Sequence, residues 1–177
     1  MSDHRITAEI VRDVGHINLR GDPQDDTFRK AAEAVLGQSL PVVPNTISDR
    51  DQRIFWLGPD EWLVMAPADR TAHLLNCLDE SLASCHAAVN DISGGNITFR
   101  LSGASTRDLF AKGCTLDFHP DVFEVGSCAQ SGLGKAVALI ALVDDSPTFD
   151  VIVRRSFSEY LVKWLQHSGR EYGIEFD

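Results

Sequence analysis

The sequence predicts an α+β protein in which one arrangement of strands and helices occurs twice. Three observations lead to this prediction: runs that alternate between apolar and polar residues, apolar stripes at helical spacing, and a nearly constant distance between corresponding positions. Gly21 and Gly103, each after a predicted strand, are 82 residues apart, and Trp62 and Phe149 are 87 residues apart. Each half therefore reads as a β-α-β-β-α unit with one further strand, the pattern of a ferredoxin-like split βαβ unit.

The first half begins with a strand over 17–20 and a helix. Asp22 suits the N-cap of this helix and Pro23 its first position, where no backbone N–H is needed. Gly37 is expected to end the helix in a left-handed conformation. The apolar face of the helix consists of Phe28, Ala31, Ala32, Val35 and Leu36. A loop over 40–52, which contains two prolines, follows.

An aromatic hairpin and a second helix complete the first half. Residues 53–57 and 62–66 are predicted strands, and the turn between them is Gly58-Pro59-Asp60-Glu61, in which the proline presets φ. The helix is expected over 68–82. Its apolar stripe consists of Leu74, Leu75, Leu78 and Leu82.

The second half opens with a predicted strand, a turn at Gly94-Gly95 and a second strand. In the second strand Ile97, Phe99 and Leu101 alternate with polar residues, which is typical of a half-buried strand. A short helix over 105–112 is expected to end at Gly113.

The rest of the second half contains an irregular segment, a hairpin and a final helix. Residues 114–126 carry no periodicity, and strands are predicted over 136–143 and 148–153. Ser156 and Glu159 fit a capping box at the start of the last helix. The apolar stripe of this helix consists of Phe157, Tyr160, Leu161, Trp164 and Leu165.

The length of 177 residues suits one good core or two small lobes packed on each other. We expect a single domain over 1–177, formed by pseudo-repeat halves at about 10–90 and 91–168. A short C-terminal tail, 169–177, would follow the second half.

Composition and charge exclude several function classes. No apolar run approaches the ~20 residues that a membrane-crossing helix needs, and the first sixteen residues lack the apolar core of a signal peptide. The net charge is −10 and no basic stripe is present, which argues against binding to nucleic acid or an anionic membrane. The expected location is the cytoplasm.

The motif survey predicts no catalytic, cofactor-binding or metal-binding residue. Gly134-Lys135 resembles part of a phosphate-binding loop, but the first glycine and the closing hydroxyl residue of that motif are absent. The Rossmann glycine fingerprint is also absent. Asp144-Asp145 reads as a turn, and His119-Pro120-Asp121 is the best remaining candidate for a polar contact. The four cysteines have no metal-ligand spacing and are expected to be reduced.

The surplus of aromatic residues on predicted strands points instead to packing. Most of these side chains are expected in the core, but Trp56 and Trp62 lie near the two ends of one turn. Because aromatic anchors are typical of permanent subunit interfaces, this pair is the candidate partner interface.

Three segments resemble the gamma subunit family of heterotetrameric sarcosine oxidase: "WLGPDEWLVMAP", "DISGGNITFRLSGASTRDLFAKGCTLDFHP" and "RRSFSEYLVKWL". The resemblance extends over about residues 10–168. It implies a subunit of an enzyme that oxidatively demethylates sarcosine to glycine, releases hydrogen peroxide and passes the one-carbon unit to tetrahydrofolate, forming 5,10-methylenetetrahydrofolate. It further implies alpha, beta and delta subunits as partners, chiefly alpha, and places FAD, FMN, NAD, tetrahydrofolate and zinc on those partners.

The second segment is also similar to the aminomethyltransferase, or folate-binding, family. The matching residues are Asp91, Ser93, Phe99, Leu101, Ser102, Gly103 and Leu109. That family is built from repeated ferredoxin-like units, so the resemblance implies one compact folate-binding-family-like domain. Members that act on tetrahydrofolate have a Gly-Gly turn before their working aspartate, and "ALVDDSPTFDVIV" lacks those glycines. This departure argues against folate chemistry in this chain.

The leading hypothesis is therefore a non-catalytic gamma subunit that packs on the large subunit of sarcosine oxidase. The sequence leaves open whether the complex acts on sarcosine or on a related N-methyl amino acid. Two alternatives also stay open: a stand-alone folate-dependent aminomethyltransferase-like protein, and a small-molecule-binding homo-oligomer.

Overall fold

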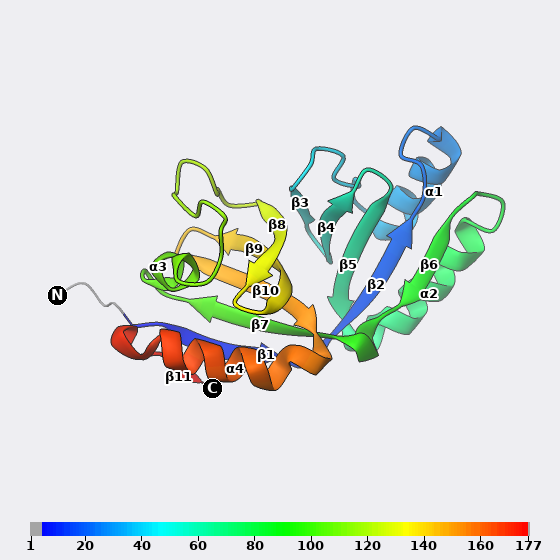
Figure 1. Ribbon diagram of the computed structural model, residues 1–177. Helices are drawn as coiled ribbons and strands as arrows, with labels where there is room; N and C mark the ends of the chain where they lie inside the picture. The colour runs from blue at the N-terminus through cyan, green and yellow to red at the C-terminus, as the bar shows by residue number, and fades with distance from the viewer. Residues whose placement is uncertain (1–4, 177) are drawn as a thin grey trace. The chain divides into compact units, whose positions relative to one another are not determined.

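The computed structural model describes residues 5–176 and has a mixed α+β architecture with two sheets. These residues form two compact units. Unit 1 contains residues 5–12 and 95–176, and unit 2 contains residues 13–94 (Figure 1). Within residues 5–176, no helix is both long enough and apolar enough to cross a membrane.

Unit 2 is a five-stranded sheet with two helices. In chain order it contains β2 (Val14–Arg20), α1 (Asp26–Leu36), β3 (Ile47–Asp49), β4 (Arg53–Gly58), β5 (Glu61–Pro67), α2 (Ala68–Ser81) and β6 (Ala88–Asp91). The strand order is β3-β4-β5-β2-β6, and all neighbours are antiparallel. Both helices lie along one face of the sheet (Figure 1), where side chains of β2, β4 and β5 form a core with those of α1 and α2.

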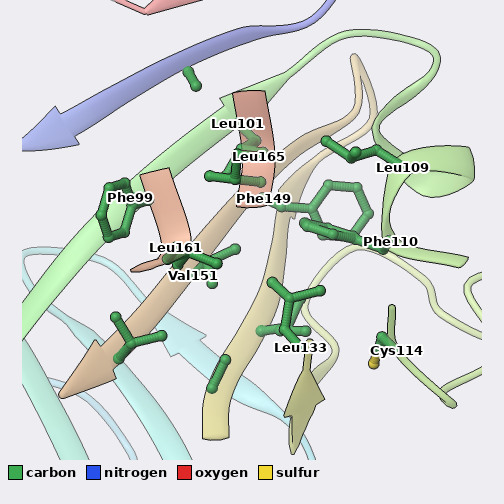
Figure 2. Packing of buried hydrophobic residues seen from close by; sticks show 14 of the residues in the cluster. Phe99, Leu101, Leu109, Phe110, Cys114, Leu133, Phe149, Val151, Leu161 and Leu165 are labelled. Carbon is green, nitrogen blue, oxygen red and sulfur yellow. The ribbon is translucent and has the colours of Figure 1, made fainter. Parts of the chain in front are cut away.

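Unit 1 is built around a six-stranded sheet. Its elements are β1 (Thr7–Val11), β7 (Asn96–Ser102), α3 (Thr106–Ala111), β8 (Cys128–Leu133), β9 (Ala136–Asp144), β10 (Thr148–Arg154), η2 (Arg155–Phe157), α4 (Ser158–Ser168), η3 (Arg170–Tyr172) and β11 (Glu175–Phe176). The strand order is β11-β1-β7-β10-β9-β8, and only the pair of β1 and β11 is parallel. Figure 2 shows its core, in which Phe99 and Leu101 pack with Phe149, Leu161 and Leu165.

The predicted helices and two of the predicted hairpins are confirmed, with small shifts at their ends. The hairpins 53–57/62–66 and 136–143/148–153 correspond to β4–β5 and β9–β10. Gly37 ends α1 with φ 68°, and its N–H donates to the carbonyl oxygen of Glu33. Local periodicity and a C-terminal glycine were sufficient for these elements because each depends on neighbouring residues.

Both predicted N-caps are wrong. Asp25, not Asp22, caps α1: its side chain accepts from the backbone N–H of Thr27, while Asp22 closes the turn before it by accepting from Gln24. Three aspartates, Asp22, Asp25 and Asp26, lie close together here. Because Asp22 forms a turn with Gln24, the helix begins later and Asp25 caps it. Ser156 lies inside the 3₁₀ turn η2, and α4 begins at Ser158 without a side-chain cap.

The expected hairpin at Gly94-Gly95 is also wrong. β6 pairs with β2 in unit 2, whereas β7 pairs with β1 and β10 in unit 1. The 3₁₀ turn η1 (Ser93–Gly95) therefore passes the chain from one sheet to the other. Two consecutive strands around a glycine turn look like a hairpin locally, and only their long-range pairing shows otherwise.

The boundaries of the two halves differ from those expected at 10–90 and 91–168. Residues 5–12 supply β1 to the sheet of unit 1, where it pairs with β7. The expected tail 169–177 supplies β11, which pairs with β1 through Thr7 and Glu175. Two short edge strands, β3 and β8, fall in segments that were expected to be a loop or were not assigned.

Gly103 is required where β7 ends beside the backbone of Arg5. Its φ is +126°, which side chains rarely adopt, and an added Cβ would lie 2.2 Å from the carbonyl oxygen of Arg5. The glycine of the "LSG" motif is thus explained by the insertion of the N-terminal strand next to β7.

We expect Gly103→Ala to lower the free energy of unfolding by at least about 2 kcal/mol, because backbone strain and a steric clash add together. Urea denaturation monitored by circular dichroism measures the change. Gly132→Ala is the matched control, since nothing lies within 4 Å of its added Cβ. Equal stability of the two variants would contradict this explanation.

Candidate functional site

The turn of the aromatic hairpin is fastened to β2 by polar contacts. The backbone N–H of Gly21 donates to the carbonyl oxygen of Asp60 at 3.1 Å, and the Arg20 guanidinium pairs with the Asp60 carboxylate at 2.8 Å. The Asn18 side chain donates to Glu61 at 2.8 Å. The "GPDEWL" stretch, which belongs to the first segment of the family resemblance, therefore has a structural explanation in this chain.

Trp62 lies in the core of unit 2 and offers no surface to a partner. Its side chain is fully buried and stacks on Phe28 with ring centroids 5.9 Å apart. Its indole Nε1–H donates to the carbonyl oxygen of Pro41 at 2.7 Å. Trp62 thus holds the α1–β3 connection against the sheet.

Trp56 is the cross-strand partner of Trp62 but is only partly buried. Its backbone N–H donates to the carbonyl oxygen of Thr46 at 3.1 Å, at the end of the same α1–β3 connection. Within that connection Val42 and Val43 are 57% and 61% exposed. We call Val42, Val43 and Trp56 the apolar ledge.

The irregular segment between α3 and β8 is fastened by Arg107. Its guanidinium donates to the carbonyl oxygens of Phe118 and, at 3.1 Å, Phe123, and it stacks on the Phe149 ring, 5.5 Å from the centroid. Partial burial lowers the pKa of Arg107, and both carbonyls accept from its Nη1. The expected polar candidate lies on the outside of this segment: His119 and Asp121 are exposed, and the His119 Nδ1 atom is 3.6 Å from the Asp121 Oδ2 atom.

The acids of the "ALVDDSPTFDVIV" stretch serve structural contacts. Asp150 is fully buried and forms a bidentate pair with its cross-strand partner Arg100, at 2.8 and 3.1 Å, which raises the pKa of the guanidinium. Asp144 accepts from the backbone N–H and hydroxyl of Ser146. Burial acts to raise the pKa of Asp144, but these hydrogen bonds outweigh it and the pKa is lowered. Asp145 is solvent-exposed.

Asp91 and Ser93, from the folate-family resemblance, form a tight turn beside β2. The Asp91 carboxylate accepts from both the hydroxyl and the backbone N–H of Ser93, and these bonds lower its pKa. The Ser93 hydroxyl oxygen accepts from the backbone N–H of His16 at 2.9 Å. Asp91 and Ser93 therefore fix the end of β6 to β2, before the chain continues into β7.

The remaining motif candidates are structural as well. Gly134 and Lys135 form the tight turn between β8 and β9, and the N–H of Lys135 donates to the Tyr160 hydroxyl. Among residues 5–176 no three or more His, Cys, Asp or Glu side chains gather as a metal site would require.

The exposed valines Val42 and Val43 and the contacts of Arg107 were not predicted from the sequence. Val42 and Val43 lie between two prolines in a predicted loop, and an apolar pair in such a loop was a usable signal. Arg107 gave no signal, because its acceptors are backbone carbonyls eleven and sixteen residues away.

Comparisons with known proteins agree with each other. Residues 20–171 match the profile of the sarcosine oxidase, gamma subunit family. The chain is 29% identical to the sarcosine oxidase subunit gamma of Corynebacterium sp. (strain P-1), over 90% of this chain and 77% of that protein. It is 28% identical to the subunit of the same name from Arthrobacter sp., over 93% and 82%.

Two solved structures share the fold. The first is the heterotetrameric sarcosine oxidase from Corynebacterium sp. U-96 in complex with pyrrole 2-carboxylate; a chain of it matches with a TM-score of 0.88 and 27% identity, over 96% of this chain and 86% of that one. The second is the glycine cleavage system aminomethyltransferase T from Bartonella henselae, with a TM-score of 0.70 over 97% of this chain and 47% of that one. At 12% identity the second match shows a common fold alone.

We expect Trp62→Ala to lower the free energy of unfolding by about 3–5 kcal/mol, because it empties a core site and leaves the Pro41 carbonyl oxygen without its donor. Trp56→Ala should cost less than about 2 kcal/mol, since its side chain is partly exposed. Chemical denaturation followed by far-ultraviolet circular dichroism gives both values. Similar losses for the two variants would show that Trp56 is a core residue too.

The Asp91 carboxyl should titrate below its ordinary pKa of 3.8. Because the folded pKa is below the unfolded one, its contribution to stability is present above about pH 5 and is lost as the pH falls through the folded pKa. Carbon-13 NMR of the carboxyl group measures this, and Ser93→Ala should move the pKa back toward 3.8. An unchanged titration in Ser93→Ala would exclude the Ser93 hydroxyl as the cause.

Proposed function

Because this chain belongs to the sarcosine oxidase, gamma subunit family, we propose that it serves as the non-catalytic gamma subunit of a heterotetrameric sarcosine oxidase. The match over residues 20–171, together with the TM-score of 0.88 to a chain of the Corynebacterium complex, is the observation that carries this proposal. The complex would oxidatively demethylate sarcosine to glycine, or a related N-methyl amino acid to the corresponding demethylated amino acid.

The chain itself contributes no reacting group in this proposal. Its best acidic candidates are engaged: Asp150 with Arg100, Asp144 with Ser146, and Asp91 with Ser93. A general acid or base must be within reach of substrate and able to exchange its proton. The resemblance to the gamma subunit family implies that FAD, FMN, NAD, tetrahydrofolate and zinc would be held by the alpha, beta and delta subunits. The four free cysteines suit a cytoplasmic complex.

We also infer that each unit is one copy of a ferredoxin-like βαββαβ repeat. In unit 2 the order β4-β5-β2-β6, antiparallel throughout, supports this inference. In unit 1 the order β9-β10-β7-β1 is equivalent, except that β1 occupies the position next to β7 that β6 occupies next to β2. The strand after the second helix, β11, is then displaced to the outer side of β1.

The apolar ledge is the docking edge that we propose for the partner, chiefly the alpha subunit. Val42 and Val43 are held outward by a connection fixed at both ends, through Trp62 to Pro41 and through Trp56 to Thr46. Exposed valines on a fixed connection, together with a partly exposed tryptophan whose backbone binds the end of that connection, suit an interface anchor, because little conformational entropy is lost on binding.

Co-expression with the other subunits of its complex tests this function. A tag on this chain should recover a flavin-carrying partner, and Trp56→Ala combined with Val42→Asp should weaken the complex by about 2 kcal/mol or more. Val137→Asp is the control, because Val137 is 70% exposed on β9, outside the ledge.

Three results would contradict the proposal. A folded wild-type chain that recovers no flavin-carrying partner would not be a gamma subunit. Heat of tetrahydrofolate binding by the full-length chain alone, measured by calorimetry, would favour the aminomethyltransferase-like alternative, and exclusive self-association would favour the homo-oligomer.

A further inference from the structure

The connection between α3 and β8 displays a second apolar surface, in unit 1. Val122 and Val125 are 61% and 54% exposed, whereas Phe118 and Phe123 of the same segment are buried. The segment thus points two aromatic rings into the core and two valines away from it. We call residues 117–125 the valine loop.

Hydrogen bonds fix the valine loop in one conformation. The N–H groups of Val122 and Phe123 both donate to the carbonyl oxygen of His119, at 2.9 Å each, and the Asp117 carboxylate accepts from the N–H of His119 at 2.8 Å. Arg107 holds the carbonyls of Phe118 and Phe123 from below. The exposed valines are therefore ordered before any partner arrives, which reduces the entropy lost on association.

An aromatic cluster gives the loop its anchor. The Phe118 ring lies 5.2 Å from that of Phe123 and 5.1 Å from that of Phe110, and Phe149 lies 5.0 Å from Phe110. The two valines cannot turn inward, because the core positions beneath the loop are already filled by these rings. Their exposure is thus a consequence of packing and not of a loose loop.

The charges on the valine loop are nearly all negative. Asp117, Asp121 and Glu124 are exposed, and the one titratable nitrogen of the segment, on His119, faces Asp121 at 3.6 Å. These acids flank the valines along the chain. A matching surface would combine an apolar centre with a positively charged border, since complementary charge guides association and selects the partner.

We propose that the valine loop docks into an apolar groove bordered by lysine and arginine side chains on a partner subunit of the complex. This inference rests on the proposed function and adds a second docking element, in unit 1, to the ledge of unit 2. The other exposed apolar side chains of unit 1, Val137 and Phe157, lie singly on β9 and η2, outside this fixed and acidic setting.

The test uses the complex formed by co-expression and captured through a tag on this chain. Val122→Asp combined with Val125→Asp should reduce the flavin fluorescence recovered per mole of chain by at least about tenfold. Val137→Asp, which adds one negative charge at an exposed valine of the same unit, should leave recovery unchanged. Thermal denaturation shows whether each variant is folded. If the aspartate double variant is not folded, the milder double variant Val122→Ser with Val125→Ser is used instead.

The contribution of the acidic residues Asp121 and Glu124 is measured by the salt dependence of partner recovery. Asp121→Asn with Glu124→Gln should lower recovery at low salt and make it less dependent on salt, because the removed charges are exposed and screened by ions. Recovery from the wild-type complex should fall more steeply between about 0.05 and 1 M salt, where the Debye length shortens from more than 10 Å to about 3 Å.

The outcomes separate this inference from the function on which it rests. Recovery of no flavin-carrying partner by the wild-type chain would contradict the proposed function. Normal recovery by wild type together with normal recovery by the folded double variant would overturn the valine loop alone. A wild-type homodimer that the double variant abolishes, with recovery of the partner intact, would show that a second copy occupies the surface and would also overturn it.

Discussion

An irregular segment can cover a folded core only where its backbone carbonyls find hydrogen-bond donors, and in each unit a side chain from outside the segment provides such a donor. In unit 2 the donor is the indole of Trp62, which binds the carbonyl of Pro41. In unit 1 it is Arg107, which binds the carbonyls of Phe118 and Phe123. Each donor fixes the connection between the first helix of the unit and the next strand. The display of valines on both connections depends on these contacts.

The carboxylates of this chain are held in structural contacts, which is consistent with a subunit role for a fold that is shared with an aminomethyltransferase. The buried carboxylate of Asp150 has a bidentate cation, Arg100, on the neighbouring strand. Such a pair fixes two strands but leaves no free proton acceptor. The turn acids Asp91 and Asp144 are likewise held by the serines two residues later. What remains exposed is apolar loop surface and solvated charge, which suits recognition of a partner.

The segments that identify the family are mostly structural in this chain. The hairpin turn at Gly58-Pro59-Asp60-Glu61 is specific because Asp60 and Glu61 fasten it to β2. Gly103 ends β7 because the N-terminal strand passes within contact of it. A strong family signal can therefore reside in residues that stabilise the fold, while the surfaces that we propose for partner binding consist mainly of exposed valines.

The sequence by itself determined the helices, the two hairpins, the α+β class and the chain's place in the family. Each of these depends on residues close in sequence, such as the alternation of Phe99 and Leu101 or the glycine at position 37. The tertiary structure alone decided that β6 and β7 lie in different sheets and that β1 enters between β7 and β11. It also decided that Trp62 is buried while its neighbour Trp56 is partly exposed. Strand pairing and side-chain burial depend on contacts between segments that are distant in sequence. Local periodicity therefore does not indicate which strand or helix will be the neighbour.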